Sequence, residues 1–247
     1  MTALLLAAGY ATRLYPLTKN FPKPLLDVQG KPVISWLVDD LEGVDGIDRY
    51  VLVSNHSYVG HFQAWYEKQK LSRPLVVLDD GTTSNEKRLG AVKDLLFSIE
   101  TLHLDDDLLV LAGDNVLEFS LKRFARYFHA KQASCVMRHR EDSLEKLRRT
   151  GVAEVDDTDR VLSMEEKPGE PKSHWAVPPF YCFRQEDIAV LPEAVKEGCP
   201  TDAPGSFISW ACSRFPVYAM RMPGRRYDIG TVESYELVRR EYKGIQT

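Results

Sequence analysis

The sequence lacks a surplus of basic residues. Its 32 lysines and arginines stand against 36 aspartates and glutamates, so the formal net charge is −4. Proteins that bind nucleic acid normally carry a basic surplus or a basic stripe, and a nucleic-acid partner is therefore not expected. A small anionic ligand is still compatible with this composition, because two or three local cations are enough to hold it.

Cysteine is scarce and scattered, and long apolar runs are missing. The four residues Cys135, Cys182, Cys199 and Cys212 form no Cys-x-x-Cys pair, which excludes a small disulfide scaffold. The apolar stretch 3–8 is too short to span a membrane, and no basic segment precedes it as in a signal peptide. We therefore expect reduced thiols, a cytoplasmic location and no membrane partner.

Two widespread phosphate-binding motifs are also missing. The dinucleotide motif G-x-G-x-x-G, if it began at Gly9, would need glycine where the chain has Ala11 and Leu14. A P-loop would need serine or threonine after Lys31, and Pro32 stands there. Neither motif is therefore predicted to bind phosphate in this chain.

Short apolar runs alternate with amphipathic stretches through the first half of the chain. The patterns predict strands at 3–8, 50–54, 74–78 and 108–112, and helices at 32–41, 61–70 and 90–99. This alternation is typical of an α/β fold, doubly wound around a mainly parallel sheet. Ligands of such folds bind beyond the carboxyl ends of the strands, where Gly9 and Asp114 are placed.

The second half has a different pattern. Apolar segments at 152–155 and 161–164 flank an Asp-rich turn and predict a hairpin. The run 175–183 looks like a strand that two prolines interrupt, which indicates an edge or a kink. The charged segment 138–149 reads as a solvated helix. Further helices are expected at 206–215 and 232–242.

The most informative segment runs from Leu6 to Pro32 and combines a glycine turn with two cations. Backbone amides after Gly9 can cradle phosphate oxygens, and Thr12 adds a hydroxyl. Arg13 offers a guanidinium fork, while Lys23 is a point charge between two prolines that restrict its backbone. Without further context, such a segment is as often a plain surface loop as a phosphate site.

This segment, LAAGYATRLYPLTKNFPKPLLDVQGKP, closely resembles the opening motif of sugar-1-phosphate nucleotidylyltransferases, L-A-A-G-x-G-T-R-L-x-P-L-T-x-x-x-P-K-P-L-L. It departs at Ala11, where the family has a second glycine. The resemblance implies one nucleotidyltransferase domain over 1–247 with a Rossmann-like fold. It also implies a nucleotide-binding half over 1–120 and a sugar-phosphate-binding half over 121–247, with a small β-rich substrate region.

The resemblance also implies a magnesium site. The family has a metal-binding aspartate after its fourth strand, where this chain has LVLAGDN with Asp114. A second is expected in the segment RYDIGTVESY, as Asp228. Two carboxylates, completed by water and phosphate oxygens, are a usual set of ligands for Mg²⁺. Taken alone, each aspartate would be interpreted as a helix cap or turn residue.

Substrate-binding residues follow from the same resemblance. The segment MEEKP matches a sugar motif, so Glu166 is expected to bind sugar hydroxyls and Lys167 the sugar phosphate; an exposed Glu–Lys pair is the alternative. Gly151 and Tyr181 complete the sugar-phosphate set, although Pro178-Pro179 replaces the family's Thr-Gly. The nucleotide is expected on Leu6, Ala8, Gly9, Thr12, Asn85 and Gly90. The glutamine that usually precedes the Leu-Gly-x-Ala segment is missing.

The implied activity is transfer of a nucleoside monophosphate from a nucleoside triphosphate, UTP or dTTP, to a sugar-1-phosphate. Arg13 and Lys23 would be the catalytic cations and Mg²⁺ the cofactor, and a homo-oligomer is possible. Three alternatives stay open. One is a CTP-dependent cytidylyltransferase that acts on a sugar phosphate or on a phosphoalcohol such as choline phosphate, and another is a non-catalytic nucleotide-binding regulator. The third is a general phosphate-binding module, which leaves the motifs of the second half unexplained.

Overall fold

The computed structural model describes residues 1–245, which fall into two compact units. Unit 1 comprises residues 1–88, 112–123 and the segment from 223 on, and unit 2 comprises 89–111 and 124–222. The two halves expected from the sequence meet at residue 120. The units differ from them because 89–111 belongs to the second unit and the C-terminal segment to the first.

Unit 1 contains the first parallel strands. Its elements are β1 (Thr2–Leu6), the 3-10 helices η1 (Thr12–Leu14), η2 (Lys23–Leu25) and η3 (Asn85–Lys87), β2 (Asp27–Val28), β3 (Lys31–Pro32), α1 (Val33–Leu41), β4 (Arg49–Ser54), α2 (Val59–Tyr66), β5 (Leu75–Asp79), β7 (Asn115–Leu117), β14 (Arg226–Asp228) and α9 (Val232–Glu241).

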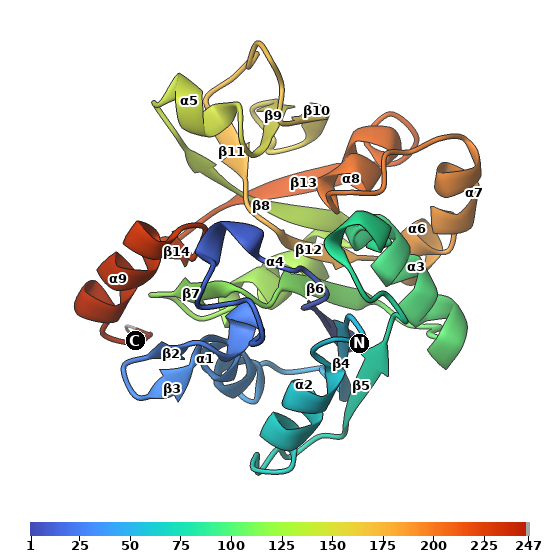
Figure 1. The fold of residues 1–247 in the computed structure, drawn as a ribbon. Helices are drawn as coiled ribbons and strands as arrows, with labels where there is room; N and C mark the ends of the chain where they lie inside the picture. Colours follow the sequence, from blue (N-terminus) through green and yellow to red (C-terminus); the bar gives the residue numbers. More distant parts are fainter. Residues whose placement is uncertain (246–247) are drawn as a thin grey trace. The chain divides into compact units, whose positions relative to one another are not determined.

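The order β1–α1–β4–α2–β5 forms a parallel sheet through helical crossovers (Figure 1). Strand β4 lies between the other two, with Tyr50 opposite both Ala3 of β1 and Leu75 of β5. All of β4 after Arg49 is buried, as a continuous apolar run predicts for a strand covered on both faces. The predicted parallel βαβ arrangement is therefore confirmed.

A smaller sheet joins distant parts of unit 1. Strand β7 pairs antiparallel with β14, and helix α9 follows immediately. This helix begins with a capping box between Thr231 and Ser234, which satisfies backbone N–H groups of its first turn. Tyr227, Tyr235 and Tyr242 bury their rings in one cluster with the apolar side of α1. The C-terminal segment is thus fixed beside the loops that follow the first strands.

Unit 2 contains the remaining elements. They are α3 (Ala91–Leu102), β6 (Leu108–Ala112), α4 (Lys122–Lys131), β8 (Ser134–Arg140), α5 (Leu144–Leu147), β9 (Gly151–Val155), β10 (Val161–Glu166), β11 (Trp175–Val177), β12 (Phe180–Phe183), α6 (Gln185–Ile188), α7 (Leu191–Lys196), α8 (Gly205–Ala211) and β13 (Val217–Arg221). The end of β6 and the start of α4 belong to unit 1.

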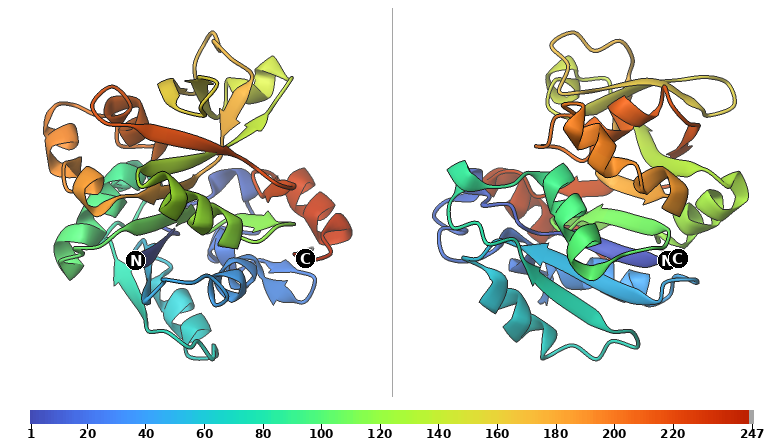
Figure 2. Two further views of the ribbon diagram at one scale, coloured as in Figure 1. Left: turned by 180° about the vertical axis from the view of Figure 1, so that it is seen from behind. Right: turned by 90° about the vertical axis from the view of Figure 1, so that its right-hand side faces the viewer.

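The strands of unit 2 are mostly antiparallel. Strand β12 pairs with β6 and β8, β11 with β8 and β9, and β9 with β10; β13 runs parallel to β8. Figure 2 shows the ribbon from two further sides. The interruption predicted within 175–183 is found as a kink, because Pro178 and Pro179 lie between β11 and β12. The β-rich region is thus mainly antiparallel.

One prediction in this region is wrong. Residues 138–149 do not form a solvated helix, since 138–140 end strand β8 and only Leu144–Leu147 are helical. Arg138 is 8% exposed, ion-paired with Asp159, and its guanidinium lies 4.2 Å from the centre of the Trp175 ring. Tertiary packing of the arginine stem over an aromatic ring overrides the polar appearance of the segment.

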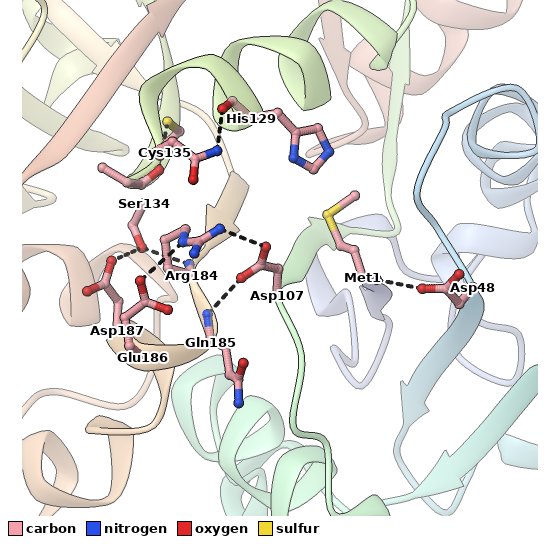
Figure 3. A network of polar contacts seen from close by, with 12 residues as sticks. Met1, Asp48, Asp107, His129, Ser134, Cys135, Arg184, Gln185, Glu186 and Asp187 are labelled. Atoms are coloured by element: carbon pink, nitrogen blue, oxygen red, sulfur yellow. Dashed lines mark hydrogen bonds and ion pairs between the residues drawn. The ribbon is translucent and has the colours of Figure 1, made fainter.

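The start of α6 is held by a polar network (Figure 3). Arg184 Nη1 donates to Asp107 Oδ2 at 3.2 Å, and the backbone N–H of Gln185 donates to Asp107 Oδ1 at 2.9 Å. Ser134 donates to Asp187 at 2.6 Å. These bonds join the first turn of the helix to the starts of β6 and β8.

No helix among residues 1–245 has both the length and the apolar character that crossing a bilayer requires.

Candidate functional site

The glycine loop after β1 is held by hydrogen bonds to neighbouring segments and is open at Gly9. Asn55, at the end of β4, donates its amide to the Ala8 carbonyl at 3.0 Å, and the Tyr10 hydroxyl donates to the Thr82 carbonyl at 2.9 Å. A Cβ built on Gly9 would have nothing within 4 Å. The turn therefore leaves room for a ligand to approach the backbone, as the predicted roles of Ala8 and Gly9 require.

Ala11 adopts a left-handed conformation, with φ +48° and ψ +42°. This is the position where the family motif has its second glycine. The Thr18 hydroxyl donates to the Ala11 carbonyl at 2.8 Å, and the Tyr58 hydroxyl donates to the Thr18 carbonyl at 2.7 Å. The surrounding loop thus holds an L-residue in a conformation that costs about 1–2 kcal/mol.

Ala11→Gly is expected to raise the free energy of unfolding by about 0.5–1 kcal/mol. Relief of the left-handed strain exceeds the added entropy of the unfolded glycine chain, which is about 0.4–1 kcal/mol. Urea unfolding of the two proteins measures the difference. Ala130→Gly, at an exposed position of helix α4, is the control and should lower stability by about 1 kcal/mol. Equal losses in both variants would contradict the strain at Ala11.

Thr12 and Arg13 lie in η1 with exposed side chains. Within residues 1–245, Arg13 makes no hydrogen bond or ion pair. A guanidinium that has no protein partner and stands beside an open glycine turn is available to an anionic ligand.

Lys23 is placed by two prolines, as the sequence predicts. Pro22 precedes η2 and Pro24 lies inside it, so the backbone on both sides of the lysine is restricted. The lysine is 8% exposed. Its Nζ lies 2.6 Å from Asp114 Oδ2 and 3.8 Å from Asp228 Oδ1. The structure therefore brings three predicted site residues together within unit 1.

Two residues that the sequence analysis did not select hold Asp114. The Asn115 amide donates to Asp114 Oδ1 at 2.8 Å and to the Ala112 carbonyl at 3.2 Å. Its own carbonyl oxygen accepts from Arg226 Nη1 at 2.6 Å. Asn115 is 1% exposed, so its amide has one orientation that serves both neighbours.

The second carboxylate is brought to this place by strand pairing. In the β7–β14 register Asn115 lies opposite Asp228, and Leu117 lies opposite Arg226. Residues two apart on a strand share a face, so Arg226 and Asp228 both face the side of Asn115. Residues separated by more than a hundred positions thus meet at Asp114.

The pKa of Asp114 lies below its ordinary value. Burial alone would raise it, but the ammonium of Lys23, its hydrogen bond to the carboxylate and the charge of Arg226 together outweigh that effect. Asp114 therefore stays ionised at neutral pH and is available as an anionic ligand.

The donor set fits a magnesium ion. Asp114 and Asp228 both approach a single cation, the ammonium of Lys23, so their oxygens already converge on one point. No group of three or more histidine, cysteine or acidic residues within 1–245 is arranged to hold a metal. Two carboxylates leave most positions to water and phosphate oxygens, which is the usual situation for Mg²⁺.

Unit 2 contains the predicted sugar residues around Glu166. A Cβ on Gly151 would lie 3.1 Å from Glu166 Oε1, and a Cβ on Gly205 would lie 1.9 Å from it. Both glycines therefore make space for this carboxylate, and Gly205 was not predicted. Lys167 lies beside it, with φ +50° and an ion pair to Asp202 at 3.2 Å.

The pKa of Glu166 is raised to about 7, because burial outweighs the attraction of Lys167 while Asp202 raises it further. We therefore expect Glu166→Gln to remove a pH dependence of stability. Below about pH 4.5 the group is neutral in both states, and as the pH rises toward 7 the folded protein must retain a proton or bury a charge. The wild type should lose about 1–3 kcal/mol of stability relative to the variant over that interval.

Unfolding midpoints measured from pH 4 to 8 provide the test for Glu166→Gln. Glu165→Gln is the control, since Glu165 is exposed and pairs with Lys172 at 2.9 Å. A stability difference that stays constant with pH would contradict the raised pKa.

The other predicted residues are placed as follows. Leu6 ends β1, and Asn85 begins η3 in unit 1. Gly90 has φ +90°, and a Cβ there would lie 2.4 Å from the Thr201 carbonyl oxygen, so this glycine is needed for packing in unit 2. Tyr181 is 1% exposed and stacks on Phe183, which fits a core position. The ligand roles of all four stay predictions.

Comparisons with known proteins show the family to which the chain belongs. The family model for nucleotidyl transferases matches residues 2–244. UTP–glucose-1-phosphate uridylyltransferase AglF of Haloferax volcanii is 28% identical over 74% of this chain and 72% of its own. UTP–glucose-1-phosphate uridylyltransferase of Synechocystis is 25% identical over the whole chain, which spans 66% of that protein.

Solved structures show the same fold. A UDP-glucose pyrophosphorylase complexed with UDP-glucose superposes with a TM-score of 0.80 and 22% identity, covering 96% of each chain. This likeness confirms the predicted Rossmann-like α/β fold, and the family match confirms the resemblance found in the opening motif. The chain belongs to the nucleotidyl transferase family.

Proposed function

We propose that the protein transfers a nucleoside monophosphate from a nucleoside triphosphate to a sugar-1-phosphate and releases pyrophosphate, with Mg²⁺ as cofactor. The observation that carries the proposal is the position of Lys23 between Asp114 and Asp228 at 2.6 and 3.8 Å. The site combines a buried ammonium and two converging carboxylates with a glycine turn and an unpaired arginine. Such a set can bind a triphosphate and stabilise the charge of the phosphoryl group during transfer.

The reaction needs no nucleophile from the protein. An oxygen of the sugar phosphate attacks the α-phosphorus of the triphosphate in line, and the bond from the α-phosphorus to the bridging oxygen of pyrophosphate breaks. The protein aligns the groups and neutralises their charge. In this proposal Lys23 contacts the α-phosphate and Arg13 the leaving pyrophosphate.

Asp114 and Asp228 are the residues that would hold Mg²⁺. When bound, the ion supplies electrostatic stabilisation for the phosphate oxygens and a template for their orientation. Asn115 and Arg226 fix one oxygen of Asp114, which leaves the position of the carboxylate defined before any ligand arrives.

The substrate assignment rests on unit 2 and on the relatives. Glu166 suits vicinal hydroxyls, Lys167 suits the sugar phosphate, and Gly151 makes space for the Glu166 carboxylate. UTP or dTTP is the favoured triphosphate, and the names of both relatives specify UTP.

We also infer a cytoplasmic location, because the four cysteines are free, as is usual in a reducing compartment. A homo-oligomer is also compatible with the proposal, and light scattering would measure the oligomeric state.

Pyrophosphate release tests the proposal directly. The purified protein is given Mg²⁺, each of the common nucleoside triphosphates in turn, and a panel of hexose-1-phosphates and choline phosphate. Release that requires UTP or dTTP and one sugar phosphate supports the proposal. Release only with CTP and an alcohol phosphate would identify a cytidylyltransferase instead. Tight triphosphate binding without release would identify a nucleotide-binding regulator.

A further inference from the structure

Four charged side chains of unit 1 form one connected group. Lys23 Nζ contacts both Asp114 and Asp228, at 2.6 and 3.8 Å. On the other side Arg226 reaches Asp114 through the amide of Asn115, over hydrogen bonds of 2.6 and 2.8 Å. Two negative charges are thus accompanied by two positive ones, and the group as a whole is neutral.

The charges next to this group are directed elsewhere. The Arg225 guanidinium lies 5.0 Å from the centre of the Tyr227 ring, and Glu118 accepts from the Tyr227 hydroxyl at 2.7 Å. Neither is connected by a hydrogen bond or ion pair of the described residues to the carboxylates. The balance therefore depends on Lys23 and Arg226.

We propose that Lys23 and Arg226 are counter-cations which neutralise the Asp114–Asp228 pair, so that the free protein binds a divalent cation weakly and retains it only together with a triphosphate. This inference rests on the proposed function of the site. A divalent cation that enters the free site meets two carboxylates and two positive groups, and gains little. A triphosphate changes the balance because its own negative oxygens pair with Lys23 and release Asp114.

The two counter-cations differ in what they can do. Lys23 is on a flexible stem, and its ammonium can move from the carboxylates to a phosphate. Arg226 is fixed by Asn115, which is buried and hydrogen-bonded on both sides. The positive charge of Arg226 therefore stays near Asp114 whether or not a ligand is bound, whereas the ammonium of Lys23 moves when a ligand binds.

Binding of Mn²⁺ to the free protein tests the proposal without turnover. Electron paramagnetic resonance of unbound Mn²⁺ gives the dissociation constant in the absence of nucleotide. We expect Arg226→Gln and Lys23→Met each to bind Mn²⁺ about tenfold more tightly than the wild type, since each removes one positive charge close to the carboxylates. Arg226→Lys keeps the charge and should stay within about twofold of the wild type.

Two further variants locate the effect. Arg225→Gln changes the net charge by the same amount one residue away and should leave the Mn²⁺ affinity within about twofold. Adding Asp228→Asn to Arg226→Gln should abolish the gain, because the gain requires the carboxylate pair. In the thermal unfolding of Arg226→Gln, added Mn²⁺ should raise the midpoint more than in the wild type.

The proposal is overturned if Mn²⁺ affinity is unchanged or weaker in both Arg226→Gln and Lys23→Met, or if Arg225→Gln shows the same gain. These results are separate from pyrophosphate release. A gain of Mn²⁺ affinity in a protein that releases no pyrophosphate would support the charge balance while contradicting the proposed reaction. Release by the wild type without any gain in the variants would do the reverse.

Discussion

Replacing Lys23 with alanine is expected to lower kcat for pyrophosphate release by about 10²–10³-fold. A preorganised charge that acts on a transferring phosphoryl group contributes about this much in other enzymes. The backbone of Lys23 is preorganised, because Pro22 and Pro24 restrict it, and its buried ammonium is already at the site, 2.6 Å from Asp114. The KM for the triphosphate should change less than kcat, since the charge of the α-phosphorus group is most developed in the transition state.

The control for Lys23→Ala is Lys19→Ala, an exposed lysine of the same loop, which should retain wild-type turnover. Circular dichroism of both variants, compared with that of the wild type, shows whether the fold is intact. A turnover for Lys23→Ala within threefold of the wild type, with the fold intact, would remove Lys23 from the catalytic residues.

The contiguous parts of the site could be predicted from the sequence. The glycine turn, Arg13 and Lys23 lie within one segment, and the apolar run before Gly9 places that segment at the end of a strand. Strand–helix alternation predicted a mainly parallel sheet, and β1, β4 and β5 are parallel in the structure. Local patterns were sufficient here because each depends on residues close together in the chain.

The parts that depend on pairing between distant segments could not be predicted. Asn115 and Arg226 meet only because β7 pairs with β14, and Gly205 makes space for Glu166 only because α8 packs against β10. The Gly-Asp-Asn sequence around Asp114 was a possible signal for Asn115. An arginine two positions before Asp228 carries no signal alone, since it is one of many charged residues.

The left-handed backbone at Ala11 could be predicted from the sequence only in part. The sequence shows that alanine replaces a glycine of the motif, and the structure shows that the position has φ +48°. The motif glycine therefore serves the backbone conformation, and the loop keeps that conformation with alanine because Thr18 and Tyr58 hold it in place.

Asp228→Asn is the second substitution with a large expected effect. It removes one of the two carboxylates while preserving the shape of the side chain and the backbone pairing of β14. We expect kcat to fall by about 10²-fold or more, and the Mg²⁺ concentration that gives half-maximal activity to rise by about tenfold, because only Asp114 then stays as a charged ligand. A titration of pyrophosphate release with Mg²⁺ measures both.

Asp45→Asn, at an exposed position of unit 1, is the control and should have the Mg²⁺ dependence of the wild type. Removal of divalent ions with EDTA should abolish release in the wild type, and added Mg²⁺ should restore it. An unchanged Mg²⁺ titration in Asp228→Asn would exclude this carboxylate as a ligand. Arg226 and Asp228 lie on one face of the same strand and carry opposite charges. Substitutions that neutralise them therefore change the charge of the site in opposite directions. The affinity of the nucleotide-free protein for Mn²⁺ should therefore fall in Asp228→Asn and rise in Arg226→Gln.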